Sequence, residues 1–212
     1  MRAMAILRTI AALLLLGAAA LAQAEPMQDV DYVLIDPPAG RPGQGIEVLE
    51  FFHYGCGACY RLEPLLSRWV ADLPGDVRFL RVPALRNSSW IPLTRLFFAL
   101  DELGALPQLH SQAFRDIHES RLNLRDAARA AQWAQDNGLD HGAFTTLLES
   151  EEMKSRVQQA RDLTLAYGVR STPSVAVDGR YLTSAAMTGS VDALLPVVDA
   201  LIDKARAARG GR

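Results

Sequence analysis

The pattern of apolar and polar residues predicts a strand, a helix and a second strand near the start of the chain. Residues 46–52 are short, β-prone and mostly apolar, which is typical of a buried strand. Residues 56–73 carry leucine and tryptophan at helical spacing until Pro74-Gly75 ends the pattern. Residues 77–82 alternate apolar and charged side chains, as a strand does. Strand, helix and strand in this order begin a parallel α/β unit.

Residues 86–167 have the periodicity of helices alone. The apolar positions of the first predicted helix are Leu93, Leu96, Phe97, Leu100 and Leu103. A second helix carries a stripe of alanines, and we expect Asn123 to be its N-cap and Gly138 its C-terminal stop. A short helix follows, and then a longer one from about Ser150 to Gly168.

Strand patterns return after the helices. Residues 174–177 and 181–183 are apolar and β-prone, and Asp178-Gly179 between them is a strong signal for a two-residue hairpin turn. Residues 191–206 form a closing amphipathic pattern. Pro196 lies inside it, so this helix either kinks or starts late.

The order of these elements predicts an α/β protein, a thioredoxin fold with an inserted all-helical domain. We expect residues 25–85 to form the first part of the thioredoxin fold and residues 168–212 its second part. The helical insertion occupies residues 86–167.

The first 24 residues have the pattern of a secretory signal peptide. Arg2 and Arg8 give a positive start, residues 10–22 are apolar, and Ala22-Gln23-Ala24 is a cleavage motif. We therefore predict cleavage after Ala24 and export to the periplasm, an oxidising compartment. An uncleaved membrane anchor is the alternative, but the apolar stretch is too short to span a bilayer.

The charge balance argues against nucleic acid as a partner. The 212 residues have a net charge of −2 and a pI near 6.1, so no excess of basic residues is available for phosphates.

The candidate chemistry lies at Cys56-Gly57-Ala58-Cys59, which contains the only two cysteines of the chain. This spacing at a helix start exposes the first sulfur and places the second one turn inside. Backbone N–H groups and the helix dipole stabilise negative charge there, so we expect a lowered pKa for Cys56. A stabilised thiolate both attacks disulfides and leaves mixed disulfides readily.

Three other uses of the cysteines fit less well. A structural disulfide closing so small a ring constrains the unfolded chain little. A zinc site needs about four ligands, and only His53 is placed to join the two sulfurs. Covalent haem attachment needs a histidine where the chain has Tyr60.

A second landmark is Thr172-Pro173, directly before the predicted strand at residue 174. Proline is tolerated at the first residue of a strand, and it has no further role on that reading. On the functional reading, Pro173 is a cis proline that packs against the cysteine motif and exposes the Thr172 backbone to a peptide substrate.

Two segments carry a resemblance to a known family: residues 50–60, EFFHYGCGACY, and residues 168–181, GVRSTPSVAVDGRY. Together with the export signal and the helical insertion, they resemble the DsbA-like thiol–disulfide oxidoreductases of the thioredoxin superfamily. The element order agrees from about residue 28 to the C-terminus.

The resemblance implies roles for individual residues. Cys56 matches the attacking thiol and Cys59 the resolving thiol. Pro173 matches the cis proline of the substrate groove, with Thr172 before it. The resemblance also places Thr172, His53 and Tyr54 at the substrate-binding surface.

Glu50 and Glu63 match acidic residues beneath the active site. The resemblance implies that they tune the sulfurs and exchange a proton with Cys59, and burial would raise their pKa values for that purpose. A solvated charge on the helix face is the alternative for Glu63.

The chain departs from strong oxidants of this family, which carry Pro-His between the cysteines. Gly57-Ala58 offers no charge and no donor side chain, so we expect a less oxidising couple. One interpretation is that His53 partly compensates for the missing histidine by stabilising the Cys56 thiolate. The alternative is that His53 is simply a packed side chain. A threonine before the cis proline, here Thr172, is also a feature that resembles the isomerase branch of the superfamily.

The predicted function is the introduction of disulfide bonds into reduced, unfolded exported polypeptides. The resemblance implies reoxidation by a quinone-linked membrane protein of the DsbB type, and no metal or organic cofactor is required. A periplasmic reductase or isomerase is the first alternative. A chaperone that binds polypeptides without redox chemistry is the second.

Overall fold

The structure is a computed structural model that describes residues 25–39 and 45–210. The predicted signal peptide and its cleavage site lie outside these residues. No helix within the described ranges combines the length and the apolar character needed to cross a membrane.

A five-stranded sheet forms the centre of the molecule, with its strands in the order β1-β5-β4-β2-β3. Only β2 and β3 run parallel, and every other neighbouring pair is antiparallel. The strands are β1 (Val33–Leu34), β2 (Ile46–Phe52), β3 (Val77–Pro83), β4 (Ser174–Val177) and β5 (Tyr181–Ser184). The interior strand β2 lies between β4 and β3, and its end leads into the loop before the cysteine motif.

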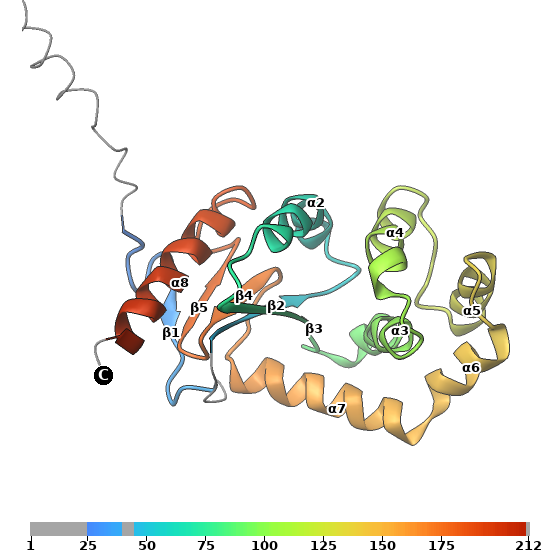
Figure 1. Cartoon of the computed structure of the whole chain (residues 1–212). Coiled ribbons are helices and arrows are strands. Elements are labelled where there is room, and N and C mark those ends of the chain that lie inside the picture. The colour runs from blue at the N-terminus through green and yellow to red at the C-terminus, as the bar shows by residue number, and fades with distance from the viewer. Residues whose placement is uncertain (1–24, 40–44, 211–212) are drawn as a thin grey trace, which may run out of the picture.

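Helices cover both faces of the sheet, with α2 (Gly57–Ala71) and α8 (Leu194–Gly210) on one face and α7 (Glu151–Ala166) along the other (Figure 1). Alternate side chains of β2 point to opposite faces of the sheet. Val48 packs in the core shared with α2 and α8, whereas Leu49 packs in the core on the opposite side. This alternation also turns the Glu50 side chain toward α2.

Helices α3 to α7 come between β3 and β4 and extend beyond one edge of the sheet (Figure 1). Their core continues that of the sheet, because Phe52 and Tyr54 at the end of β2 are buried among their side chains. The new elements are η2 (Ser88–Trp90), α3 (Ile91–Glu102), α4 (Leu106–His118), α5 (Ala127–Asp136) and α6 (His141–Glu149).

A hairpin turn forms at Asp178-Gly179 as predicted, but three residues rather than two separate the strands, because Val177 pairs with Tyr181. Asp178 and Gly179 have positive φ angles of 56° and 62°, which a hairpin turn of this type requires. The last helix starts late, at Leu194, so Pro196 lies within its first turn, where its missing N–H donor costs nothing.

The predicted N-cap of α5 was wrong. Asp126, rather than Asn123, accepts a hydrogen bond from the backbone N–H of Arg129 at 2.9 Å. Asn123 instead accepts from the backbone N–H of Arg125 and closes a turn before the helix. Leu124 between them is buried in the core, so the chain inserts this side chain before it turns into α5.

Candidate active site

Cys56 is the N-cap of α2, with an extended backbone, and its sulfur accepts a hydrogen bond from the backbone N–H of Cys59 at 3.3 Å. Cys56 is half-buried, whereas Cys59 is only 1% exposed. Both are separate thiols in this structure. The arrangement predicted from the spacing, with one accessible sulfur and one interior sulfur, is confirmed.

The pKa of the Cys56 thiol is lowered to about 6. The largest cause is the hydrogen bond with the Cys59 side chain, and this outweighs the opposing effect of burial. The Thr172 side chain and the backbone N–H groups of Cys59 and Ala58 add to the stabilisation of the thiolate. Cys56 is therefore mostly ionised at pH 7.

The pKa of Cys59 moves the opposite way, well above its ordinary value. Burial is the main cause, and the neighbouring Cys56 and the charge of Glu50 act in the same direction. The two sulfurs are thus chemically distinct. One is a stable thiolate near the surface, and the other holds its proton inside the protein.

The Thr172–Pro173 peptide bond is cis, as predicted, and it packs against the cysteine motif. The carbonyl oxygen of Thr172 lies 3.3 Å from Cys56 Sγ, where it can accept a hydrogen bond only from the thiol form. A cavity of about 770 Å³ borders this loop and is lined by residues that include Ser171, Ser174 and Met187. Open space is therefore available at the residues that flank Thr172 and Pro173 in sequence.

Glu50 and Arg81 face each other on the sheet beneath α2, because the parallel register pairs these two positions. Arg81 Nε lies 3.4 Å from Glu50 Oε2, and Glu50 is only 2% exposed. Burial raises the pKa of Glu50 to about 8, although the charge of Arg81 opposes the shift. Glu50 is therefore mostly protonated at pH 7.

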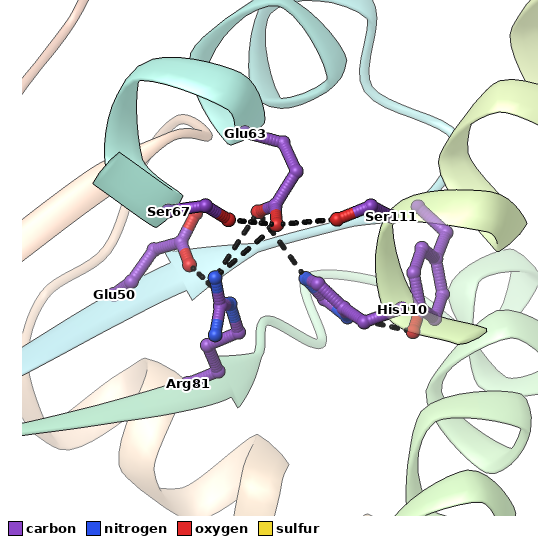
Figure 2. A network of polar contacts seen from close by, with 7 residues as sticks. Glu50, Glu63, Ser67, Arg81, His110 and Ser111 are labelled. Atoms are coloured by element: carbon purple, nitrogen blue, oxygen red, sulfur yellow. Dashed lines mark hydrogen bonds and ion pairs between the residues drawn. The ribbon is translucent and has the colours of Figure 1, made fainter. Parts of the chain in front are cut away.

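Glu63 is also buried, so it is not the solvated helix charge considered as an alternative. Figure 2 shows Arg81 between the two glutamates and the α4 residues His110 and Ser111 approaching Glu63. Arg81 Nη2 and His110 Nε2 lie 3.2 and 3.4 Å from Glu63 Oε2. The hydroxyls of Ser67 and Ser111 donate to Glu63 Oε1 at 2.7 and 2.9 Å.

The expectation of a raised pKa for Glu63 was wrong, because this pKa is lowered to about 2. Burial alone would raise it, but His110, Arg81 and the Ser67 hydroxyl together outweigh burial. The two buried carboxyl groups thus hold different charges at neutral pH.

Tyr54 connects this network to the loop before the cysteines. Its hydroxyl lies 2.8 Å from Nδ1 of His110, and both side chains are buried. Burial raises the pKa of Tyr54 and lowers that of His110, so both groups are neutral at pH 7. A phenol that donates to Nδ1 leaves the proton of His110 on Nε2, which faces Glu63.

His53 does not supply a charge to Cys56. Its ring stacks on Trp90, with centroids 4.1 Å apart, and burial lowers its pKa to about 4. The predicted substrate contacts of His53 and Tyr54 also need correction, since both side chains lie in the interior at 4% and 1% exposure. They support the cysteine loop from below.

Several residues of the site were not predicted from the sequence: Ser67, Arg81, Trp90, His110 and Ser111. The sequence contained one indication for Arg81, because it is a charged residue on the predicted strand that follows the buried strand of Glu50. In the described part of the chain, no three His, Cys, Asp or Glu side chains converge to hold a metal ion.

A thioredoxin fold with a helical insertion, an asymmetric cysteine pair and an adjacent cis proline defines a thiol–disulfide oxidoreductase. The sequence matches the DSBA-like thioredoxin domain family over residues 47–195, and the chain belongs to this family.

Similar proteins bear this out. The chain is 39% identical to the thiol:disulfide interchange protein DsbA of Bordetella parapertussis over 204 residues, which covers 91% of this chain and 96% of that one. Identity to DsbA of Azotobacter vinelandii is 36%, covering 81% and 80%. The crystal structure of Pseudomonas aeruginosa DsbA superposes with a TM-score of 0.83 at 31% identity, covering 87% and 97%. The protein is accordingly an enzyme that introduces disulfide bonds by thiol–disulfide interchange.

Proposed function

We propose that the protein works in the periplasm, where it transfers the Cys56–Cys59 disulfide to reduced, unfolded exported polypeptides. The observation that carries this proposal is the contrast between the two thiols. The pKa of Cys56 is lowered to about 6 at the accessible position, while the pKa of buried Cys59 is raised. The predicted signal peptide, with cleavage after Ala24, supports the location.

The exchange needs two steps, and the contrast between the two thiols supports a different role for each sulfur. A substrate thiolate attacks Cys56 of the oxidised pair, the bond between Cys56 and Cys59 breaks, and a mixed disulfide forms. A second substrate thiolate then attacks the substrate sulfur of that mixed disulfide, and Cys56 leaves as a thiolate. The substrate is oxidised by two electrons and the enzyme becomes a dithiol. A leaving group with a pKa of about 6 favours the second step.

Glu50 is the group that we assign to the proton of Cys59. In the first step Cys59 leaves as a thiolate and takes up a proton, and Glu50, with a pKa of about 8, still carries one at pH 7. The charge of Glu50 also raises the pKa of Cys59, which places the two groups within electrostatic reach. Glu63 stays ionised and acts by holding Arg81 in position.

Substrate binding falls to the loop that contains Thr172 and Pro173. A cavity lined by Ser171 and Ser174, the residues that flank this pair in sequence, offers room for part of an extended polypeptide. Thr172 lies against the Cys56 sulfur, so its backbone is placed to meet a segment joined to that sulfur.

Reoxidation of the dithiol requires an acceptor of two electrons and two protons. We propose a membrane protein of the DsbB type that passes the electrons to a quinone. The enzyme itself needs no metal or organic cofactor for the exchange.

The direction in which the disulfide is transferred follows from the stability of the Cys56 thiolate. Stabilising the Cys56 thiolate stabilises the dithiol form relative to the disulfide, so the couple becomes more oxidising. Gly57 and Ala58 add no further stabilisation from their side chains, so the oxidising strength rests on hydrogen bonding alone. A reductase, an isomerase or a chaperone without redox chemistry are the alternatives.

Equilibration of the purified protein with glutathione buffers tests the direction. We expect the reduction potential of the Cys56–Cys59 couple to lie well above that of the glutathione pool. A potential well below it would indicate a reductase or a merely structural bridge. Replacing both cysteines by serine should abolish disulfide formation in a reduced test protein, and a chaperone would keep its polypeptide-binding activity in this variant.

A further inference from the structure

Another cavity lies between α3, α5 and α6, apart from the one lined by Ser171 and Ser174. Its volume is about 370 Å³, and its lining is largely apolar, with Leu96, Leu124, Ala128 and Leu148 among the contributing side chains. This volume is at the small end of the range for ligand pockets and suits one or two apolar side chains.

Two arginines line the same cavity, Arg95 from α3 and Arg125 from the loop before α5. Arg95 Nε is buried and has no hydrogen-bond partner within the described residues. No carboxylate in the described ranges forms an ion pair with either guanidinium group. A buried N–H donor without a partner costs free energy, and a carboxylate is the acceptor that binds guanidinium most strongly.

Arg125 joins this cavity to the reacting sulfur. Its Nη2 atom lies 2.6 Å from the position that a Cβ atom would take at Gly55, the residue directly before Cys56. Glycine at this position is what makes room for the guanidinium. Because consecutive Cα atoms are about 3.8 Å apart, a chain bonded to Cys56 needs only a few residues to reach the cavity.

We infer that this cavity is a substrate subsite, which takes an apolar side chain and a neighbouring Asp or Glu a few residues from the reacting cysteine. The inference rests on the proposed function and names the polypeptides that the enzyme prefers. The apolar side chain fills the space between the helices, and the carboxylate pairs with Arg125 and Arg95. Glu149 also lines the cavity, so a basic substrate residue is the competing occupant that the test must separate.

Short synthetic peptides with a single cysteine provide the probe. One carries leucine and aspartate near the cysteine, a second has lysine in place of the aspartate, and a third has serine in place of the leucine. The rate of mixed-disulfide formation with oxidised enzyme is measured by quenched-flow mass spectrometry. We expect the peptide with leucine and aspartate to react about tenfold faster than either of the others, which corresponds to about 1.4 kcal/mol.

Matched variants assign the preference to the cavity. Arg125→Glu should remove or reverse the preference for aspartate over lysine, whereas Arg129→Glu, with the same change in net charge, should keep it. Ala128→Trp fills the cavity and should remove the advantage of leucine. Gln135→Trp, an exposed position on the same helix, should not. Equal rates for all peptides, a preference for lysine, or equal effects of the matched variants would overturn the subsite.

The reaction with dithiothreitol separates this inference from the proposed function. A disulfide that dithiothreitol reduces normally, together with no preference among the peptides, overturns the subsite alone. A disulfide that oxidises neither dithiothreitol nor any of the peptides overturns the proposed function as well.

Discussion

Glu50 and Glu63 share one cation, the guanidinium of Arg81, and yet their pKa values lie on opposite sides of neutrality. The difference follows from the number of donors around each carboxylate. Two serine hydroxyls, His110 and Arg81 surround Glu63. Within the described residues, Glu50 has only the 3.4 Å contact with Arg81 Nε, and its Oε2 atom has no hydrogen bond. One acid therefore keeps its charge beneath the active site, and the other keeps its proton.

The first prediction concerns Glu50→Gln. Below pH 8 the folded protein holds a proton on Glu50 that the unfolded chain loses above about pH 4.3, so this group stabilises the fold less as the pH rises through this window. The glutamine variant should lose this dependence, by up to about 1.4 kcal/mol per pH unit. Urea unfolding of the oxidised protein between pH 5 and pH 8 measures it without titrating thiols.

Glu63→Gln provides the contrast. The lowered pKa of Glu63 gives stability that is present above about pH 4.3 and is lost as the pH falls toward 2. This variant should change the acid side of the stability profile and leave the slope above pH 5 intact. An unchanged slope in Glu50→Gln, or the same change in both variants, would contradict the assignment of charges.

The second prediction concerns the shared cation. Arg81→Met leaves the carboxylate of Glu63 buried with one cation fewer, and we expect a loss of about 3–5 kcal/mol in the free energy of unfolding. Arg78→Met, on the same strand, removes only an exposed ion pair with Glu47 and should cost at most about 1 kcal/mol. Denaturant unfolding at pH 7 compares the two variants. Equal losses would mean that Arg81 contributes no more than a surface charge.

The local parts of this site could be predicted from the sequence. The apolar run of β2 indicated that Glu50 is buried, and the spacing of Cys56 and Cys59 indicated one accessible and one interior sulfur. Both conclusions depend only on periodicity within a single element. The hairpin turn at Asp178-Gly179 is local in the same sense.

The contacts between distant segments could not be predicted in this way. Helical periodicity places Glu63 on a face of α2 but does not say that α4 brings His110 and Ser111 to that face. The sign of the pKa shift of Glu63 depends on these neighbours, so burial alone gave the wrong direction. The strand β1 has two residues, too few for any alternation to be recognised.

The third prediction tests how Thr172 acts on the nucleophile. Thr172→Val removes the hydroxyl that helps to stabilise the thiolate, so the pKa of Cys56 should rise from about 6 toward about 7. The reduction potential should fall in parallel, because the dithiol form is stabilised less. The ultraviolet absorbance of the thiolate, titrated against pH, reports the pKa. Thr172→Ser keeps the hydroxyl and should stay close to the parent protein, and a matching rise in that variant would exclude the hydroxyl as the cause.

The fourth prediction concerns the link from Tyr54 through His110 to Glu63. His110→Phe leaves the buried Tyr54 hydroxyl without its acceptor and removes a contact from Glu63, so we expect a loss of about 1–3 kcal/mol in the free energy of unfolding. Tyr54→Phe alone leaves Nδ1 of His110 unpaired and should cost an amount in the same range.

The double variant Tyr54→Phe/His110→Phe distinguishes a coupled network from independent packing. If the phenol and the imidazole act together, the double variant should be less destabilised than the sum of the single variants, by about 0.5 kcal/mol or more. In the control cycle, Gln108→Ala, at an exposed position on α4, replaces His110→Phe. The free energies of its single variants should add to that of the double variant within about 0.5 kcal/mol. Additive energies for Tyr54 and His110 would show that the network ends at His110 and does not reach the loop that carries Cys56.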